Sequence, residues 1–338
     1  MAELRVRSSA GDYDVLVGPG VRSQLAQRLG QRNFLVTDEN VARHWGDAFD
    51  ALLKPVAKLV LPAGEVSKSL ATAERIWRWL ANHTAMRADT LVALGGGVVG
   101  DVAGFAASTF HRGMPLVHIP TTLLAQVDSS IGGKVAIDLP EGKNLVGAFH
   151  APKLVVADTD TLSTLPERER WNGLAELVKT ALIGDANLFA ELERDLSATP
   201  ERIARAAAIK SEIVSRDEHD RGERMHLNFG HTLGHALEAV TGYGPLLHGE
   251  AIVVGMRLAT QLSAQRGLAD AKRVDAVLAR FKLPRIDASL DDVLAAMKLD
   301  KKGSRFILLE SLGQARIVND IDGGAIRELA AQILESLR

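Results

Sequence analysis

The sequence contains no cysteine among its 338 residues. Disulfide bonds and thiolate metal ligands are therefore excluded, so any bound metal must use histidine, aspartate, glutamate or water. The absence also fits a reducing cytosol. Net charge is almost absent, because 40 basic residues face 42 acidic ones and leave −2. This balance argues against nucleic acid as the main partner, since proteins that bind the phosphate backbone usually carry a basic surplus.

Long apolar runs are missing as well. No stretch reaches the ~20 apolar residues that cross a bilayer, so we expect no membrane partner. The first residues lack the apolar core of a signal peptide, and no repeat occurs at solenoid spacing. We therefore expect a cytoplasmic protein. What the chain does have is a 46% apolar composition. That is enough to bury a full core over two domains of ordinary size.

The first half alternates short, β-branched apolar runs with amphipathic stretches. An apolar stripe over residues 70–80 predicts one of the helices. Runs that are apolar throughout are typical of strands covered on both faces, so the alternation predicts a mostly parallel sheet with helices on both sides. The predicted strands are residues 34–37, 58–61, 90–94, 116–119 and 154–157.

Helical periodicity dominates from about residue 169 to 280, and residues 305–309 and 315–318 read as a hairpin. We therefore predict an α/β N-terminal nucleotide-binding domain over residues 1–162 and a mainly α-helical, metal-binding C-terminal domain over residues 163–338. The boundary falls in a cluster of Asp, Thr, Ser and Pro at 158–166. A cleft between two domains is where a ligand is expected.

The most informative segment spans residues 224–235 and is followed by His248. His231 and His235 lie four apart, so on a helix both imidazoles project from one face. Glu176 interrupts an apolar helical pattern, and a charge in that setting should be paired or bound to a metal. Imidazoles and a carboxylate converging on one point suit a divalent metal of the zinc type. Spacing alone leaves open whether His235 is a ligand, an anion-binding group or a proton-transfer group.

Two further features of the helical half concern anions. Arg224 and Asn228 lie one helical turn apart, a spacing that suits the binding of an anion. Lys179 lies one turn beyond Glu176, so it could face the same cleft. A metal and an anion-binding pair together suggest an enzyme that acts on a phosphorylated or carboxylated alcohol.

A glycine-rich turn, Gly95 to Gly97, follows the strand at 90–94 and opens a helix. Such a helix offers free N–H groups and a partial positive charge to a phosphate, although a tight turn without any ligand is the plainer interpretation. Three other turns also follow predicted strands and are expected at the same edge of the sheet, which favours a bound ligand there. Four such turns favour a dinucleotide, because nucleotides bind at the carboxyl ends of parallel strands. The other three carry Gly64, Glu65 and Lys68; Thr121 and Thr122; and Asp38.

The middle of the chain is polar and rich in lysine, from Asp128 to Lys134 and at Lys143 and Asn144. Solvated lysines on a surface loop are the commoner outcome. The functional interpretation has Lys134 and Lys143 bridging the anions of cofactor and substrate. Arg112 could join them or reach across a subunit boundary.

Taken together, these residues resemble the 3-dehydroquinate synthase family of sugar phosphate cyclases. The resemblance runs from about Asp38 to Lys302, and its specific pieces are residues 95–101, 128–134, 143–144, 176 with 179, 224–235 and 248–250. Two positions depart from the commonest pattern: Asp138 where Asn is frequent, and Asp220 where Glu is. Both keep a polar or acidic group.

The resemblance implies a homodimer that uses NAD and one divalent metal, Zn or Co, per subunit. It implies conversion of 3-deoxy-D-arabino-heptulosonate 7-phosphate, a phosphorylated sugar acid, to 3-dehydroquinate and phosphate by transient oxidation, β-elimination, re-reduction and aldol closure. It assigns the metal to Glu176, His231 and His248. It assigns the substrate and catalysis to Asp128, Lys134, Asn144, Lys179, Lys210, Arg224, Asn228, His235, Lys301 or Lys302, and the neighbouring subunit's copy of Arg112.

The resemblance further implies that NAD contacts the turns at the edge of the sheet. The residues are Asp38, Asn40, Gly64, Glu65, Lys68, Gly96, Gly97, Val98, Val99, Gly100, Asp101, Thr121, Thr122, Lys134, Lys143, Thr161, Leu162 and Thr164.

Three alternatives stay open. One is a related cyclase acting on an amino or other heptulose substrate. Another is a metal-dependent polyol or alcohol dehydrogenase, which would accumulate NADH. The last is a non-catalytic paralogue that binds nucleotide, but such a protein is expected to have lost Lys134, Asn144 or a metal ligand, and all are present.

Overall fold

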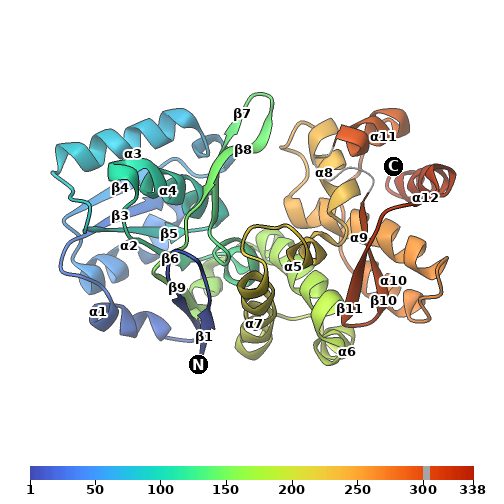
Figure 1. Ribbon diagram of the computed structural model, residues 1–338, viewed down its shortest axis with the longest axis horizontal. Helices are drawn as coiled ribbons and strands as arrows, with labels where there is room; N and C mark the ends of the chain where they lie inside the picture. The colour runs from blue at the N-terminus through green and yellow to red at the C-terminus, as the bar shows by residue number, and fades with distance from the viewer. Residues whose placement is uncertain (300–304) are drawn as a thin grey trace. The chain divides into compact units, whose positions relative to one another are not determined.

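The computed structural model describes residues 1–299 and 305–338 (Figure 1). It separates into two compact units. Unit 1 comprises Met1–Pro166 and Thr199–His219, and unit 2 comprises Glu167–Ala198 and Asp220–Arg338. Helix α7 (Pro200–Arg216) thus belongs to unit 1, although it follows the first helices of unit 2 in the sequence. Among the described helices, none is both long and apolar enough to span a bilayer.

Unit 1 is built on a seven-stranded sheet in the order β1-β2-β9-β6-β5-β3-β4. Strand β1 pairs with β2 antiparallel, and the other neighbours pair in parallel. The mostly parallel sheet predicted from the sequence is therefore confirmed, with β1 and β2 added at one edge. The strands are β1 (Ala2–Val6), β2 (Tyr13–Gly18), β3 (Asn33–Asp38), β4 (Ala57–Leu61), β5 (Thr90–Gly95), β6 (Leu116–Pro120) and β9 (Leu154–Asp158).

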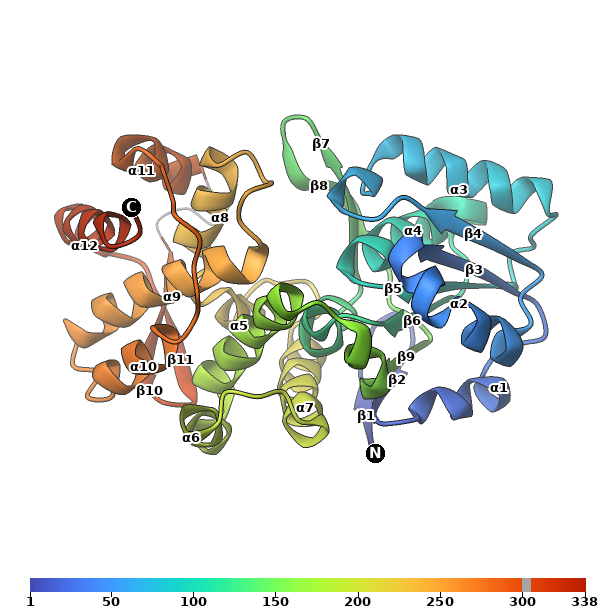
Figure 2. The same ribbon diagram turned by 180° about the vertical axis from the view of Figure 1, so that it is seen from behind.

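Both faces of this sheet are covered by helices (Figures 1 and 2). On one face α3 (Leu70–Asn82) and α4 (Gly97–Thr109) pack over side chains such as Phe34 and Leu91. On the other face the 3₁₀ helix η1 (Val21–Gln24), α1 (Leu25–Arg28) and α2 (Glu39–Leu53) pack over Leu35 and Val92. Successive residues of a strand point to opposite faces of the sheet. Because helices cover both faces, neighbouring residues along a strand must both be apolar. This explains why the strands read as unbroken apolar runs.

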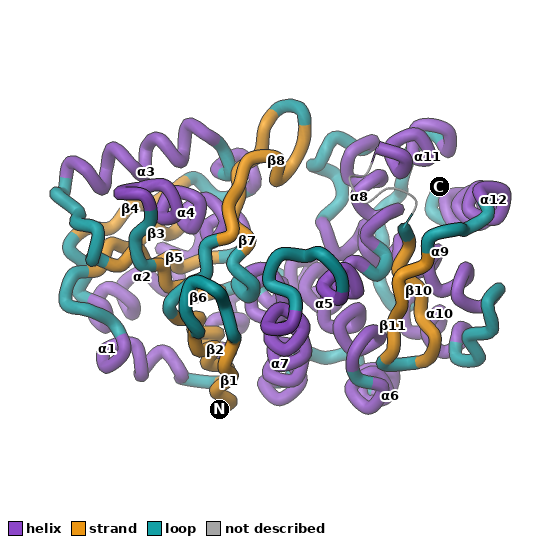
Figure 3. The backbone as a smooth tube through the Cα atoms, in the orientation of Figure 1, coloured by secondary structure: helices purple, strands orange, loops and turns teal. Residues whose placement is uncertain are grey.

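A separate two-stranded hairpin, β7 (Lys134–Leu139) and β8 (Gly142–Phe149), extends from unit 1 (Figure 3). The sequence did not predict it, because its polar residues and glycines hide the alternation. Val135 and Ile137 are buried in the core beneath α4, which anchors the hairpin. Short helices complete the unit: η2 (Glu65–Ser67), η3 (Phe110–Arg112), the π-helical turn η4 (Ala125–Ser129) and η5 (Thr159–Thr164).

Unit 2 is mainly helical, as predicted, and includes the expected C-terminal hairpin. Helix α9 (His248–Ala264) lies at its centre and packs against α5, α8, α10, α12 and β10. Its buried positions extend nearly all round its axis, which is typical of a central helix. The other elements are α5 (Glu167–Gly184), α6 (Ala186–Arg194), η6 (Glu223–Asn228), α8 (His231–Val240), α10 (Ala271–Leu278), α11 (Leu290–Leu299), α12 (Gly323–Glu335), β10 (Phe306–Ser311) and β11 (Gln314–Val318).

Candidate metal and nucleotide sites

Three side chains from three helices of unit 2 form a candidate metal group. Glu176 comes from the middle of α5, His231 is the first residue of α8, and His248 is the first residue of α9. Glu176 Oε1 lies 3.9 Å from His231 Nε2 and 3.5 Å from His248 Nε2. One ligand atom from each residue lies within 4.8 Å of the others. A carboxylate oxygen and two imidazole nitrogens at this spacing are a donor set that suits zinc or a similar divalent ion.

The electrostatics of the group also fit a cation. The side chain of Glu176 is fully buried, and a carboxylate removed from water requires positive partners. Lys179 pairs with it from one turn along α5. Burial alone would lower the pKa of His248, but hydrogen bonds to Glu176 and Glu238 raise that pKa to about 10. Without a metal, the protonated ring of His248 thus provides the positive charge beside Glu176 that a divalent ion would otherwise provide.

The first turn of α9 is locked onto α5. Gly249 N donates to Asn172 Oδ1 at 2.6 Å, and a Cβ on Gly249 would lie 2.2 Å from the carbonyl oxygen of Asn172. Glu250 accepts from Leu247 N at 2.8 Å and from both Nε and an Nη of Arg168, on α5, at 2.7 and 2.8 Å. These contacts fix His248 against Glu176, which explains the His-Gly-Glu run of the sequence.

The glycines among the α8 histidines admit the backbone of α9. A Cβ on Gly234 would lie 2.6 Å from Ile252 Cδ1 and 3.2 Å from Ala251 O. A Cβ on Gly230 would lie 2.7 Å from the backbone nitrogen of Met256, so α9 fills the space beside both glycines. The close approach brings the first turns of α8 and α9 together, so the rings of His231 and His248 lie 5.3 Å apart.

His235 lies beside the metal group. Its ring centroid is 5.1 Å from that of His231 and 6.0 Å from that of His248. With Glu238 and His248 it forms a second set whose ligand atoms lie within 4.8 Å of one another. The role of His235 therefore stays a prediction.

The remaining predicted residues of unit 2 lie just before α8 or outside the described residues. Arg224 is buried in η6, and Asn228 ends η6 and donates from Nδ2 to Met225 O at 3.0 Å. Lys301 and Lys302 lie outside the described residues.

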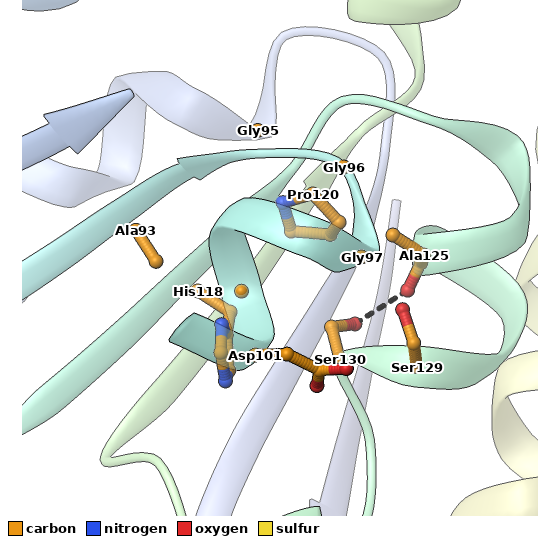
Figure 4. A pocket seen from close by; sticks show the side chains of 11 residues that line it. Ala93, Gly95, Gly96, Gly97, Asp101, His118, Pro120, Ala125, Ser129 and Ser130 are labelled. Atoms are coloured by element: carbon orange, nitrogen blue, oxygen red, sulfur yellow. Dashed lines mark hydrogen bonds between the residues drawn. The ribbon is translucent and has the colours of Figure 1, made fainter. Parts of the chain in front are cut away.

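In unit 1 the glycine-rich turn has the predicted strand-to-helix geometry. Strand β5 ends at Gly95 and α4 begins at Gly97, so Val98, Val99 and Gly100 occupy its first turn. Figure 4 shows a small cavity at this turn; its lining includes Gly95, Gly96, Gly97, Gly100, Asp101, His118, Ser129 and Ser130.

Thr121 continues this edge from the end of β6. Its N–H donates to Gly95 O at 3.0 Å, while its hydroxyl is buried without a hydrogen-bond partner in the part of the chain that the structure describes. Thr122 Oγ1 accepts from Ala125 N at 3.2 Å. A buried hydroxyl beside a glycine turn fits a polar ligand group, and the helix N-terminus fits a phosphate.

The turn at Gly64 carries balanced charge. Lys68 is buried and its Nζ lies 2.5 Å from Asp101 Oδ2, while Lys143 Nζ lies 3.0 Å from Glu65 Oε1. Burial raises the pKa of Asp101, and Lys68 partly offsets that shift. The expected phosphate-facing lysine is thus held by a carboxylate, so it orders the turn as well as carrying charge.

Several predicted cofactor residues also have local structural roles. Asp38 Oδ1 accepts from the N–H groups of Asn40 and Val41 and caps α2. Thr161 Oγ1 donates to Asp158 O at 2.7 Å, and Leu162 is buried beside it in η5. Thr164 Oγ1 accepts from the indole N–H of Trp45 at 2.9 Å. Their contact with a cofactor stays a prediction.

Among the predicted substrate residues, Asp128 and Lys210 come together. Lys210 Nζ lies 2.6 Å from Asp128 Oδ1 and 2.6 Å from its carbonyl oxygen. Lys134 at the start of β7, Asn144 on β8 and Arg112 in η3 have exposed side chains.

Sequence reasoning missed four residues that shape these sites. Arg168 and Asn172 hold α9, Glu238 contacts His248, and His118 lines the cavity at the glycine turn. Helical spacing could have found Glu238, because it follows His231 by seven residues and so shares its face of the helix. The partners of Arg168 and Asn172 are distant in sequence and left no such signal.

Comparison with known proteins decides the family. The family model described as 3-dehydroquinate synthase N-terminal matches residues 58–172, and that described as 3-dehydroquinate synthase C-terminal matches residues 173–303. The chain belongs to the 3-dehydroquinate synthase family. A 3-dehydroquinate synthase of Bradyrhizobium diazoefficiens is 43% identical over 95% of this chain and 94% of the relative.

Two solved structures of sugar phosphate cyclases share the fold. One, 27% identical with a TM-score of 0.86, is 2-deoxy-scyllo-inosose synthase with carbaglucose-6-phosphate, NAD⁺ and Co²⁺. The other, 29% identical with a TM-score of 0.86, is 2-epi-5-epi-valiolone synthase from Streptomyces hygroscopicus subsp. jinggangensis 5008 with NAD⁺ and Zn²⁺. Each alignment covers 99% of both chains.

Proposed function

We propose that the protein is a 3-dehydroquinate synthase, a phosphate-eliminating carbon–oxygen lyase. It would convert 3-deoxy-D-arabino-heptulosonate 7-phosphate to 3-dehydroquinate and inorganic phosphate. The observation that carries this proposal is the group of Glu176, His231 and His248 in a chain 43% identical to a synthase of that name. Bound NAD and a divalent cation, Zn or Co, would supply reversible hydride transfer and Lewis acidity at one hydroxyl of the substrate.

The chain's own residues have separate tasks in this proposal. Glu176, His231 and His248 hold the cation, and the N–H groups at the start of α4 bind the cofactor phosphates. Lys210 and Arg224 would bind the carboxylate end of the substrate. Lys134, Asn144 and His235 serve the phosphate end, where positive charge stabilises the leaving group. Asp128 fixes the ammonium of Lys210.

A phosphate-release assay tests the proposal. The purified protein should release inorganic phosphate from the heptulosonate phosphate when NAD and Zn²⁺ or Co²⁺ are present, and a chelator should abolish release. Absorbance at 340 nm should show no net NADH, because the hydride returns to the same substrate. Stoichiometric NADH would instead identify a dehydrogenase, and phosphate release only from another heptulose phosphate would identify a related cyclase.

We also propose a homodimer in which Arg112 contacts substrate in the neighbouring subunit. Its support is the exposed position of Arg112 and its left-handed backbone, with φ of 62°, which holds the segment in an unusual turn. Light scattering should give twice the chain mass of 36.3 kDa. Mixing Arg112→Ala with an inactive metal-group variant should restore part of the activity, because one mixed site keeps both intact groups. A monomer of full activity would contradict the proposal.

A further inference from the structure

Glu238, a buried carboxylate on α8, contacts the nitrogen of His248 that faces away from Glu176. Its Oε2 lies 3.2 Å from His248 Nδ1, while His248 Nε2 lies 3.5 Å from Glu176 Oε1. Only 4% of Glu238 is exposed. An imidazole that gives one nitrogen to a metal keeps its proton on the other, and an acceptor there fixes both the tautomer and the ring plane.

His231 has the same arrangement with a different acceptor. Its Nδ1 lies 3.2 Å from the carbonyl oxygen of Phe229, so its Nε2 also faces Glu176. The two histidines of the metal group are thus oriented alike, one by the backbone and one by a side chain. We infer that Glu238 is a positioning residue that holds His248 Nδ1–H and so directs the Nε2 lone pair to the metal.

The inference rests on the proposed metal group but not on the proposed substrate. Glu238 also belongs to the second set of possible ligands, with His235 and His248. A metal in that set that used His248 Nδ1 would replace the hydrogen bond between Nδ1 and Glu238 Oε2. With Nε2 bound to the metal, the ring donates its remaining proton from Nδ1 to the carboxylate and stays neutral, which favours an orienting role for Glu238.

The test measures metal binding in Glu238→Gln and Glu238→Ala, with competition by a chromophoric chelator. Loss of such an outer partner typically weakens metal binding about 10–100-fold. We expect that loss in the alanine variant and a smaller loss in the glutamine variant, which keeps an acceptor oxygen of similar reach. The visible spectrum of bound Co²⁺ should change in both. A matched control is Glu328→Gln, an exposed glutamate on α12.

Wild-type metal affinity and an unchanged Co²⁺ spectrum in both variants would overturn the inference. Two metal equivalents per wild-type chain, with one lost in Glu238→Ala, would overturn it too, because Glu238 would then be a ligand. Both variants should still unfold cooperatively without metal, with a far-ultraviolet circular dichroism spectrum like that of the wild type, which separates positioning from folding. Metal binding is measured without turnover. Absence of phosphate release would therefore contradict the proposed function without affecting the result for Glu238.

Discussion

Glu176 shows how one residue's environment selects its chemistry. Its carboxylate is fully buried on α5, with Lys179 paired to it and two imidazoles facing it. Burying such a charge is costly unless cations surround it, and removing one member of a buried pair leaves the other uncompensated. The residue is therefore placed to attract a divalent ion more strongly than a solvated glutamate would.

Replacing a histidine of the group should remove the metal. In His231→Ala or His248→Ala we expect metal affinity to fall on the order of 100-fold or more, which exceeds the usual cost of losing an outer partner. Elemental analysis after dialysis measures the content, and phosphate release measures activity. His83→Ala is the control, because His83 is exposed at the end of α3 in unit 1. Full metal content in both variants would show that the ligands lie elsewhere.

His118 predicts a pH dependence of stability. Burial, with a smaller contribution from the charge of His150, lowers the pKa of His118 from 6.5 to about 4. Between those values the unfolded chain binds a proton that the folded chain does not, so stability falls as pH drops from 6.5 towards 4. The free energy of unfolding should fall by an amount on the order of 2–3 kcal/mol over this range. Urea unfolding at pH 7 and pH 4.5 should show a smaller difference in His118→Gln than in the wild type; equal differences would contradict the assignment.

At the scale of elements, the contact between the first turn of α9 and α5 sets the metal group. Asn172 and Glu176 lie one turn apart on α5, and Asn172 binds the residue that follows His248. The Arg168–Glu250 pair, one turn earlier on α5, holds the same turn of α9. Two ligands from distant parts of the chain thereby share one rigid contact.

Gly249→Ala should break that contact. The new methyl would meet the Asn172 carbonyl at 2.2 Å, a backbone atom that cannot rotate away. Forced separation of packed elements costs about 1–3 kcal/mol, and metal affinity should fall with it because His248 moves from Glu176. Chemical unfolding and metal titration measure the two effects. Gly323→Ala on α12 is the control, since open space surrounds its Cβ position; equal behaviour of both variants would refute the argument.

For the whole molecule, the structure divides the candidate groups between two compact units. The metal group comes entirely from unit 2, and the glycine turn with Thr121 comes entirely from unit 1. A ligand stabilises the folded state by mass action, about 2.7 kcal/mol at a hundred times its dissociation constant. Each ligand should therefore protect its own unit first.

Hydrogen exchange measured by mass spectrometry can test whether each ligand protects its own unit. Zn²⁺ alone should slow exchange in peptides from α5, α8 and the start of α9. NAD alone should slow exchange at the β5–α4 turn and at the end of β6. Inorganic phosphate at equal ionic strength serves as the control for unspecific anion effects. Zn²⁺ protection confined to unit 1 would contradict the metal group, and NAD protection confined to unit 2 would contradict the nucleotide turn.

The sequence by itself determined the local elements and the kinds of chemistry available. Apolar runs and 3.6-residue stripes are local patterns, so the strands at 34–37 and 90–94 and the helix at 70–80 were predictable. The lack of cysteine restricted the metal ligands to histidine and carboxylate. Only the tertiary structure decided which groups meet. His231 and His248 face Glu176, Glu238 orients His248, and Lys68 meets Asp101, because packing joins residues that no periodicity relates.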